Sequence, residues 1–148
     1  MSEGDGDGIN GIVVLGTTGE SPTIEPEERT ELIKITVAEC KGKIPAIVGT
    51  GSNSTKKTIE ETREAKDLGA NYALIVSPYY NKPTQEGLYL HFTAVADAVD
   101  IPIIVYNIKG RTGVNIETAT LKRMAQHKNI IGVKEASGDL AQMKEVLH

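Results

Sequence analysis

The sequence predicts an α/β fold of parallel strands and helices, arranged either as part of a TIM-type (β/α) barrel or as an open doubly wound sheet. Five short apolar runs, rich in β-branched residues, recur about every 30 residues along the chain. Each run is apolar almost throughout, which is typical of strands covered on both faces. Segments with helical periodicity separate the runs, and connections this short imply parallel strands with right-handed crossovers.

The apolar runs give the positions of the predicted strands and the extent of the predicted domain. In chain order, the predicted strands are Gly11–Leu15, Pro45–Gly49, Tyr72–Ser77, Ile101–Tyr106 and Ile130–Val133. We expect residues 1–8 to form a flexible, acidic, Gly-rich tail and residues 9–148 to form one partial (β/α) barrel domain. A closed eight-stranded barrel typically needs about 250 residues, so a chain of 148 residues is expected to be too short for one.

Helices are expected between the strands because helix-starting residues precede the apolar stripes. Pro26 suits the first position of a helix, and Glu27 and Glu28 suit its first turn. The predicted caps of the later helices are Ser54 or Asn53, then Thr84, Asn115 and Ser137. The third helix has a regular inner stripe formed by Leu88, Phe92, Val95, Ala96 and Val99.

Composition and charge exclude several classes of protein. The net charge is -4 and the isoelectric point is near 5.4, which argues against nucleic-acid partners and against a polybasic membrane surface. No apolar run reaches the roughly 18 residues that span a bilayer. Cys40 is the one cysteine, so no internal disulfide and no cysteine-rich metal site are expected. The sequence therefore predicts a cytoplasmic protein.

The polar residues that follow the strands are the candidate functional residues, because both architectures place their sites at the carboxyl ends of the strands. After the first strand, Gly16 and Gly19 bracket the hydroxyls of Thr17 and Thr18. Such a loop can offer backbone N–H groups and hydroxyls to a carboxylate. An ordinary polar turn has the same composition, and the residues alone do not separate the two interpretations.

Three further candidates follow the fourth and fifth strands. Tyr106 closes an apolar strand, where a phenol can relay protons, although a Tyr ring at this place often only packs. Lys134 directly follows a strand, and burial of a lysine there would favour the neutral amine that Schiff-base chemistry requires; many such lysines instead extend to solvent. Arg111 lies between glycines and can bind a carboxylate with two hydrogen bonds, or it is a solvated loop charge.

The loops after the second and third strands are less specific. Gly49-x-Gly51 resembles the start of a dinucleotide-binding loop, but Ser54 stands where the third glycine would be. Tyr79 and Tyr80 are adjacent, so both rings cannot easily enter one core; they indicate a substrate or subunit contact, or local packing on nearby prolines. Taken together, a carboxylate-binding loop, a tyrosine, an arginine and a lysine at one end of the sheet favour an imine-forming enzyme acting on a 2-oxo acid.

Four motifs resemble the dihydrodipicolinate synthase family of the N-acetylneuraminate lyase superfamily. The resemblance extends from about Ile9 to His148. The motifs are Gly16-Thr17-Thr18-Gly19-Glu20-Ser21, Pro78-Tyr79-Tyr80-Asn81-Lys82-Pro83-Thr84-Gln85-Glu86-Gly87, Tyr106-Asn107 with Gly110-Arg111-Thr112-Gly113, and Val133-Lys134-Glu135-Ala136. The family fold is an eight-stranded barrel, and this chain corresponds to its second through sixth strands.

The resemblance implies a role for each candidate. Lys134 would form the Schiff base with pyruvate, and Tyr106 would relay protons together with Thr17. Tyr80 would complete the relay by reaching into a neighbouring subunit's site. The substrate-binding residues would be Gly16, Thr18, Gly19 and Arg111, with Thr17 also contacting the pyruvate carboxylate and Arg111 receiving aspartate semialdehyde.

The implied reaction is condensation of pyruvate with aspartate semialdehyde in lysine biosynthesis, without a metal or organic cofactor, by a homo-oligomer. Three alternatives remain open. The first is another 2-oxo acid aldolase of the superfamily, of the N-acetylneuraminate lyase or 2-keto-3-deoxygluconate aldolase type. The second is an inactive truncated barrel, since residues that exclude water and fix Lys134 would be missing. The third is a nucleotide-binding domain built on Gly49-x-Gly51.

Overall fold

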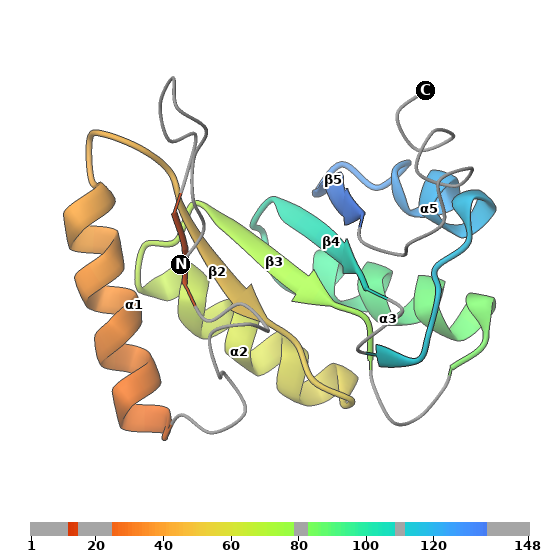
Figure 1. The fold of residues 1–148 in the computed structure, drawn as a ribbon, viewed down its shortest axis with the longest axis horizontal. Helices are drawn as coiled ribbons and strands as arrows, with labels where there is room; N and C mark the ends of the chain where they lie inside the picture. Colours follow the sequence, from red (N-terminus) through yellow and green to blue (C-terminus); the bar gives the residue numbers. More distant parts are fainter. Residues whose placement is uncertain (1–11, 15–24, 79–82, 109–111, 136–148) are drawn as a thin grey trace.

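The computed structural model describes residues 25–78, 83–108 and 112–135, together with the backbone of residues 12–14. The strands of this part form one parallel sheet in the order β1-β2-β3-β4-β5 (Figure 1). They are β1 (Ile12–Val14), β2 (Ala46–Thr50), β3 (Tyr72–Val76), β4 (Ile103–Asn107) and β5 (Ile130–Glu135). The helices are α1 (Pro26–Cys40), α2 (Thr55–Asp67), α3 (Gln85–Ala98) and α5 (Thr118–Met124).

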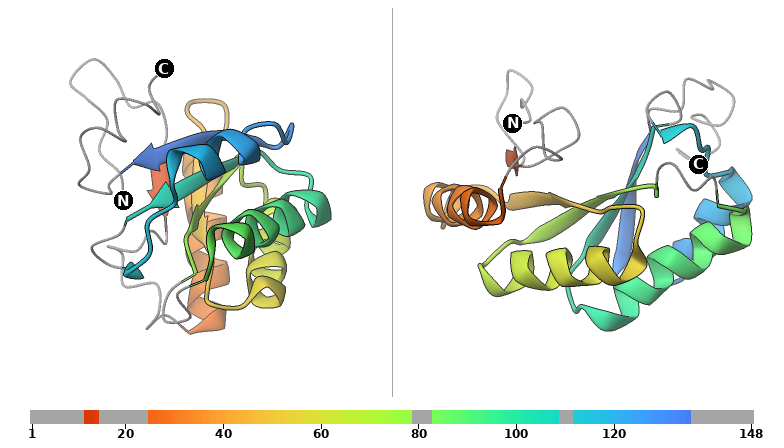
Figure 2. Two further views of the ribbon diagram at one scale, coloured as in Figure 1. Left: turned by 90° about the vertical axis from the view of Figure 1, so that its right-hand side faces the viewer. Right: turned by 90° about the horizontal axis from the view of Figure 1, so that it is seen from below.

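These helices lie on one side of the sheet, as Figure 2 shows. Contacts agree with the picture: Ile33 of α1 and Ala65 of α2 pack against Val48 of β2, and α3 and α5 pack on the same face farther along the sheet. A doubly wound sheet has helices on both faces and reverses its strand order at a switch point. The described strands run in sequential order with helices on one face, so the partial (β/α) barrel is confirmed and the doubly wound alternative is wrong.

The main core lies between the sheet and the later helices. Ile75, Ile103 and Val105 face this layer from the sheet, and all three are nearly inaccessible to solvent. The predicted inner stripe of α3 is confirmed, because each of its members is buried there: Leu88, Phe92, Val95, Ala96 and Val99. A second, smaller cluster lies on the other face of the sheet, where Leu74, Val76 and Tyr106 are buried together.

The helix starts follow local hydrogen-bond chemistry at α1, α2 and α3. Pro26 occupies the start of α1. The Ser54 hydroxyl accepts from the Lys57 N–H and caps α2, while the Thr84 hydroxyl accepts from the Gly87 N–H and caps α3. Within α1, the apolar residues Leu32 and Ile35 are 38% and 55% exposed.

The predicted start of the fourth helix is wrong. Asn115 does not cap α5, which begins at Thr118 after Glu117. Instead, the Asn115 side chain accepts a hydrogen bond from the Asn107 amide, 3.1 Å away. The predicted fifth helix beginning at Ser137, and the predicted tail over residues 1–8, lie outside the described residues.

Candidate functional site

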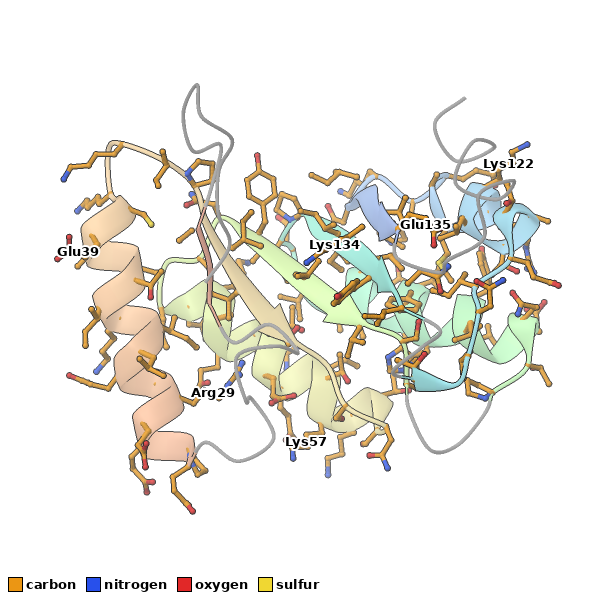
Figure 3. All side chains as sticks on the ribbon, viewed as in Figure 1. Arg29, Glu39, Lys57, Lys122, Lys134 and Glu135 are labelled. Carbon is orange, nitrogen blue, oxygen red and sulfur yellow. The ribbon has the colours of Figure 1, made fainter. Side chains whose placement is uncertain are left out.

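Lys134 and Tyr106 meet at the carboxyl ends of two neighbouring strands. They are partners in the pairing of β4 with β5. The Lys134 Nζ lies 4.5 Å from the centroid of the Tyr106 ring, a cation–π contact. Figure 3 shows the lysine over the face of the sheet turned away from α2 and α3. The two residues predicted to carry imine chemistry and proton transfer are thus brought together on one face.

The two side chains differ in their exposure to solvent. Tyr106 is 5% exposed, so its ring is held by packing. Lys134 is exposed and lies within β5, so of the two interpretations that the sequence left open, a buried lysine and one that extends to solvent, the structure shows the second. The predicted strand Ile130–Val133 is too short, because β5 extends beyond its apolar run and ends only at Glu135.

Two buried polar residues beside this pair had not been assigned roles. Ser77 follows β3, and its N–H and hydroxyl both donate to the Tyr106 carbonyl oxygen, at 3.2 and 3.4 Å. Asn107 follows Tyr106 and is fully buried. The sequence signal for both was a small polar residue at the end of an otherwise apolar strand, a place where a buried polar group needs defined partners.

Asn107 bonds to two other segments of the chain. Its Nδ2 donates to Oε1 of Glu135 and to Oδ1 of Asn115, each at 3.1 Å. Its Oδ1 accepts from the Ile116 N–H at 3.0 Å. The amide therefore fixes the end of β4 to the end of β5 and to the segment that leads into α5.

The remaining predicted site residues lie outside the described residues. They are Gly16, Thr17, Thr18 and Gly19 of the first loop, Tyr80 of the third loop, and Arg111 of the fourth. Their roles stay predictions.

The loop after β2 uses its polar groups for hydrogen bonds at the start of α2. The Ser52 N–H donates to the Thr58 hydroxyl at 3.0 Å, and the Ser54 N–H donates to the Ser52 hydroxyl at 3.1 Å. Gly51 has a φ of 124°, and a Cβ there would lie 3.2 Å from Cγ1 of Val76. The glycine is thus explained by backbone conformation and close packing, and amides that a phosphate would need are already bonded, which argues against the nucleotide-binding alternative.

The described part of the chain holds neither a metal-ligand cluster nor a membrane-spanning helix. None of its His, Cys, Asp and Glu side chains form a group of three or more that could hold a metal ion. None of the helices described there is long and apolar enough to cross a membrane.

Comparison with known proteins gives consistent matches. The profile of the Dihydrodipicolinate synthetase family matches residues 6–148. The 4-hydroxy-tetrahydrodipicolinate synthase of Trichlorobacter lovleyi is 58% identical over 140 residues, which cover 95% of this chain and 48% of that protein. The corresponding protein of Endomicrobium trichonymphae is also 58% identical, over 94% of this chain and 48% of its own. The chain spans about half the length of the curated relatives it matches.

Solved structures show the same similarity in three dimensions. Dihydrodipicolinate synthase from Acinetobacter baumannii, complexed with pyruvate, superposes with a TM-score of 0.91 at 52% identity and covers 95% of this chain and 48% of that one. The enzyme from Thermotoga maritima gives a TM-score of 0.92 at 50% identity, with the same coverage. Because the family profile matches almost the whole sequence and its solved members share the fold, the chain belongs to the dihydrodipicolinate synthetase family.

Proposed function

We propose that this chain carries out Schiff-base chemistry on pyruvate, with Lys134 as the reacting amine, in the condensation with aspartate semialdehyde that serves lysine biosynthesis. The observation that carries the proposal is the placement of the Lys134 Nζ 4.5 Å from the centre of the Tyr106 ring, at the carboxyl ends of β4 and β5. The A. baumannii relative complexed with pyruvate supports the choice of substrate.

The chemistry needs an amine and a proton carrier side by side. The neutral Lys134 amine adds to the C2 carbonyl carbon of pyruvate, the carbinolamine loses one water to give an imine, and uptake of one proton gives the iminium ion. Loss of a C3 proton then gives an enamine. The enamine carbon bonds to the aldehyde carbon of aspartate semialdehyde, whose oxygen takes up a proton. The amino group of the product finally adds to the imine carbon and expels the lysine, which closes the ring.

Tyr106 is assigned as the proton carrier, because it pairs with Lys134 on the neighbouring strand and its phenol ring contacts the amine. From the family resemblance, Thr17 links to Tyr106, and Tyr80 completes the relay from a second subunit of a homo-oligomer. The pyruvate carboxylate is assigned to Thr17 and Thr18 with Gly16 and Gly19. The second substrate is assigned to Arg111. No metal or organic cofactor enters these steps, and the proposed location is the cytoplasm.

Reductive trapping tests the proposal directly. The purified chain is incubated with pyruvate and sodium borohydride, and its peptides are analysed by mass spectrometry. We expect one reduced pyruvate adduct, on Lys134. Lys134→Arg should abolish the adduct. The matched control Lys128→Arg removes an exposed lysine from the turn before β5 and should leave trapping unchanged.

Two outcomes would contradict the proposal. A folded sample that gives no adduct would favour the inactive partial barrel. An adduct that condenses with sugar-acid aldehydes but not with aspartate semialdehyde would favour another aldolase of the superfamily. Each result is read only after circular dichroism shows that the sample has the secondary structure of the α/β fold.

A further inference from the structure

The pairing of β4 with β5 is irregular before it reaches the candidate site. Ile103 pairs with Ile130, but Ile104 pairs with Gly132, so the register shifts by one residue and Ile131 is passed over. This is a β-bulge, in which two residues of one strand oppose one residue of the other. The Ile131 side chain is 54% exposed, so the extra residue is not explained by packing of that side chain in the core.

The bulge exchanges the faces to which the later β5 side chains point. Side chains alternate along a regular strand, so Ile130 and residue 134 would lie on the same face. In this structure Ile130 and Val133 both pack against the main core beside the helices. Lys134 contacts the Tyr106 ring on the opposite face. A regular strand would have turned the lysine toward the helices.

Beyond the bulge, one polar contact fixes the new register. The pairs Tyr106 with Lys134 and Asn107 with Glu135 follow each other. The Asn107 Nδ2 lies 3.1 and 3.3 Å from the two Glu135 carboxylate oxygens. Asn107 is itself held by the Ile116 N–H. Because a slip of one residue sends every side chain to the other face, this contact stabilises the register that pairs Lys134 with Tyr106.

We infer that the bulge at Ile131, together with the Asn107–Glu135 hydrogen bonds, is a positioning device that turns Lys134 toward Tyr106 and away from the helix layer. Asn107 and Glu135 are positioning residues, because they fix the register of β5 against β4 and thereby orient the side chain of Lys134. The inference deepens the proposed function, and it rests on that function only in taking Lys134 as the reacting amine.

The first test removes the bulge. Deletion of Ile131 restores regular pairing, whereas the matched control Ile131→Ala keeps the chain length and the bulge. In the parent chain and in Ile131→Ala, the Lys134 Hε resonances should be shifted upfield by the Tyr106 ring. In the deletion variant that shift should vanish, and the rate of pyruvate trapping should fall about 100-fold or more.

The second test leaves the length of the strand unchanged. Glu135→Ala removes the acceptor of the Asn107 amide, and Glu135→Gln keeps an acceptor oxygen. Glu135→Ala should weaken the upfield shift of Lys134 and slow trapping on the order of tenfold, and Glu135→Gln should restore most of both. If the deletion variant does not fold, this pair of variants decides the question, because neither changes the number of residues in β5.

The outcomes separate this inference from the proposed function. The positioning role would be overturned if the Lys134 resonances kept their full upfield shift in the deletion variant. The same conclusion would follow if they kept it in Glu135→Ala. A parent chain that shows the shift but forms no adduct with pyruvate would contradict the proposed function, and it would still support the positioning role if the shift is lost in the deletion variant and weakened in Glu135→Ala. The NMR measurement needs no substrate, so it is independent of activity.

Discussion

His91 is a buried histidine with one hydrogen bond in the core of the described structure. Its Nδ1 lies 2.8 Å from the Thr55 hydroxyl, its ring packs edge-on against Phe92, and its Nε2 is buried without a hydrogen-bond partner. Burial lowers the pKa of His91 from 6.5 to about 4, because a charged imidazolium loses its hydration there. The residue is therefore kept neutral by the fold.

This burial predicts a loss of stability in acid. Between pH 6.5 and about pH 4 the unfolded chain binds a proton at His91 and the folded chain does not, so the free energy of unfolding falls as the pH falls through this window. The loss should be about 2–3 kcal/mol between pH 7 and pH 4.5. Urea titrations at pH 7 and pH 4.5 measure it, and His91→Gln should lose less stability than the parent. Equal losses in the two proteins would contradict the prediction.

At the residue scale, the sequence identified which side chains lie at the candidate site better than it identified the direction in which they point. Lys134 and Tyr106 were predicted to lie at the same end of the sheet, and they do. The sequence left open whether the lysine is buried or extends to solvent, and it placed the end of the strand at Val133, whereas β5 continues to Glu135. The face on which the lysine lies depends on a bulge, and a bulge is decided by pairing with β4 rather than by the apolar run itself.

The start of α5 is held by a residue from another helix. Gln85 of α3 donates from Nε2 to the Asn115 carbonyl at 2.9 Å. Its Oε1 accepts from the Glu117 N–H at 3.0 Å and from the Thr120 hydroxyl at 2.7 Å. The Glu117 side chain itself makes no capping bond. Gln85 therefore satisfies polar groups at this helix start and joins α3 to α5.

Removing this contact should weaken the whole domain. Gln85→Leu deletes the acceptor and the donor at the start of α5, and it should lower the free energy of unfolding by about 1–2 kcal/mol. Chemical denaturation measures the change. The control Lys122→Gln alters an exposed residue of α5 and should stay within about 0.5 kcal/mol of the parent. Similar effects of the two variants would contradict a capping role for Gln85.

At the element scale, the sequence predicted helix caps whose hydrogen-bond partners lie a few residues away. It did not predict the cap of α5, whose side chain comes from another helix. Ser54 and Thr84 bond to amides three residues later, so their type and position signal the helix start. Gln85 precedes Glu117 by 32 residues. Asn115 seemed a suitable cap by type, but its side chain bonds to Asn107, because the end of β4 requires a partner for its buried amide.

At the scale of the whole molecule, β3 and β4 are interior strands of the described sheet. β3 pairs with β2 and β4 on its two sides, and β4 pairs with β3 and β5. Ile75 and Val105 of these strands are almost fully buried beneath the helices. β5 pairs irregularly and carries the exposed Ile131. Local opening should therefore be easier along β5 than in the centre of the sheet.

Hydrogen exchange followed by NMR tests this gradient. The amide protons of Ile75 and Val105 should exchange slowest, through unfolding of the whole domain. The amide of Ile131 should exchange about 100-fold faster or more, through local opening at the bulge. Equal protection of Ile131 and Val105 would show that the bulge is as firmly held as the central strands.

The sequence by itself determined the alternation of strands and helices, the aliphatic stripe of α3, and the presence of Tyr106 and Lys134 at strand ends, because periodicity and local hydrogen bonding act over a few residues. Only the tertiary structure decided that the helices of the described part share one face of the sheet, that Asn107 joins Glu135, and that Lys134 points toward Tyr106. These features depend on strand pairing between segments about 30 residues apart, and a single skipped residue, Ile131, reverses the face on which the lysine lies.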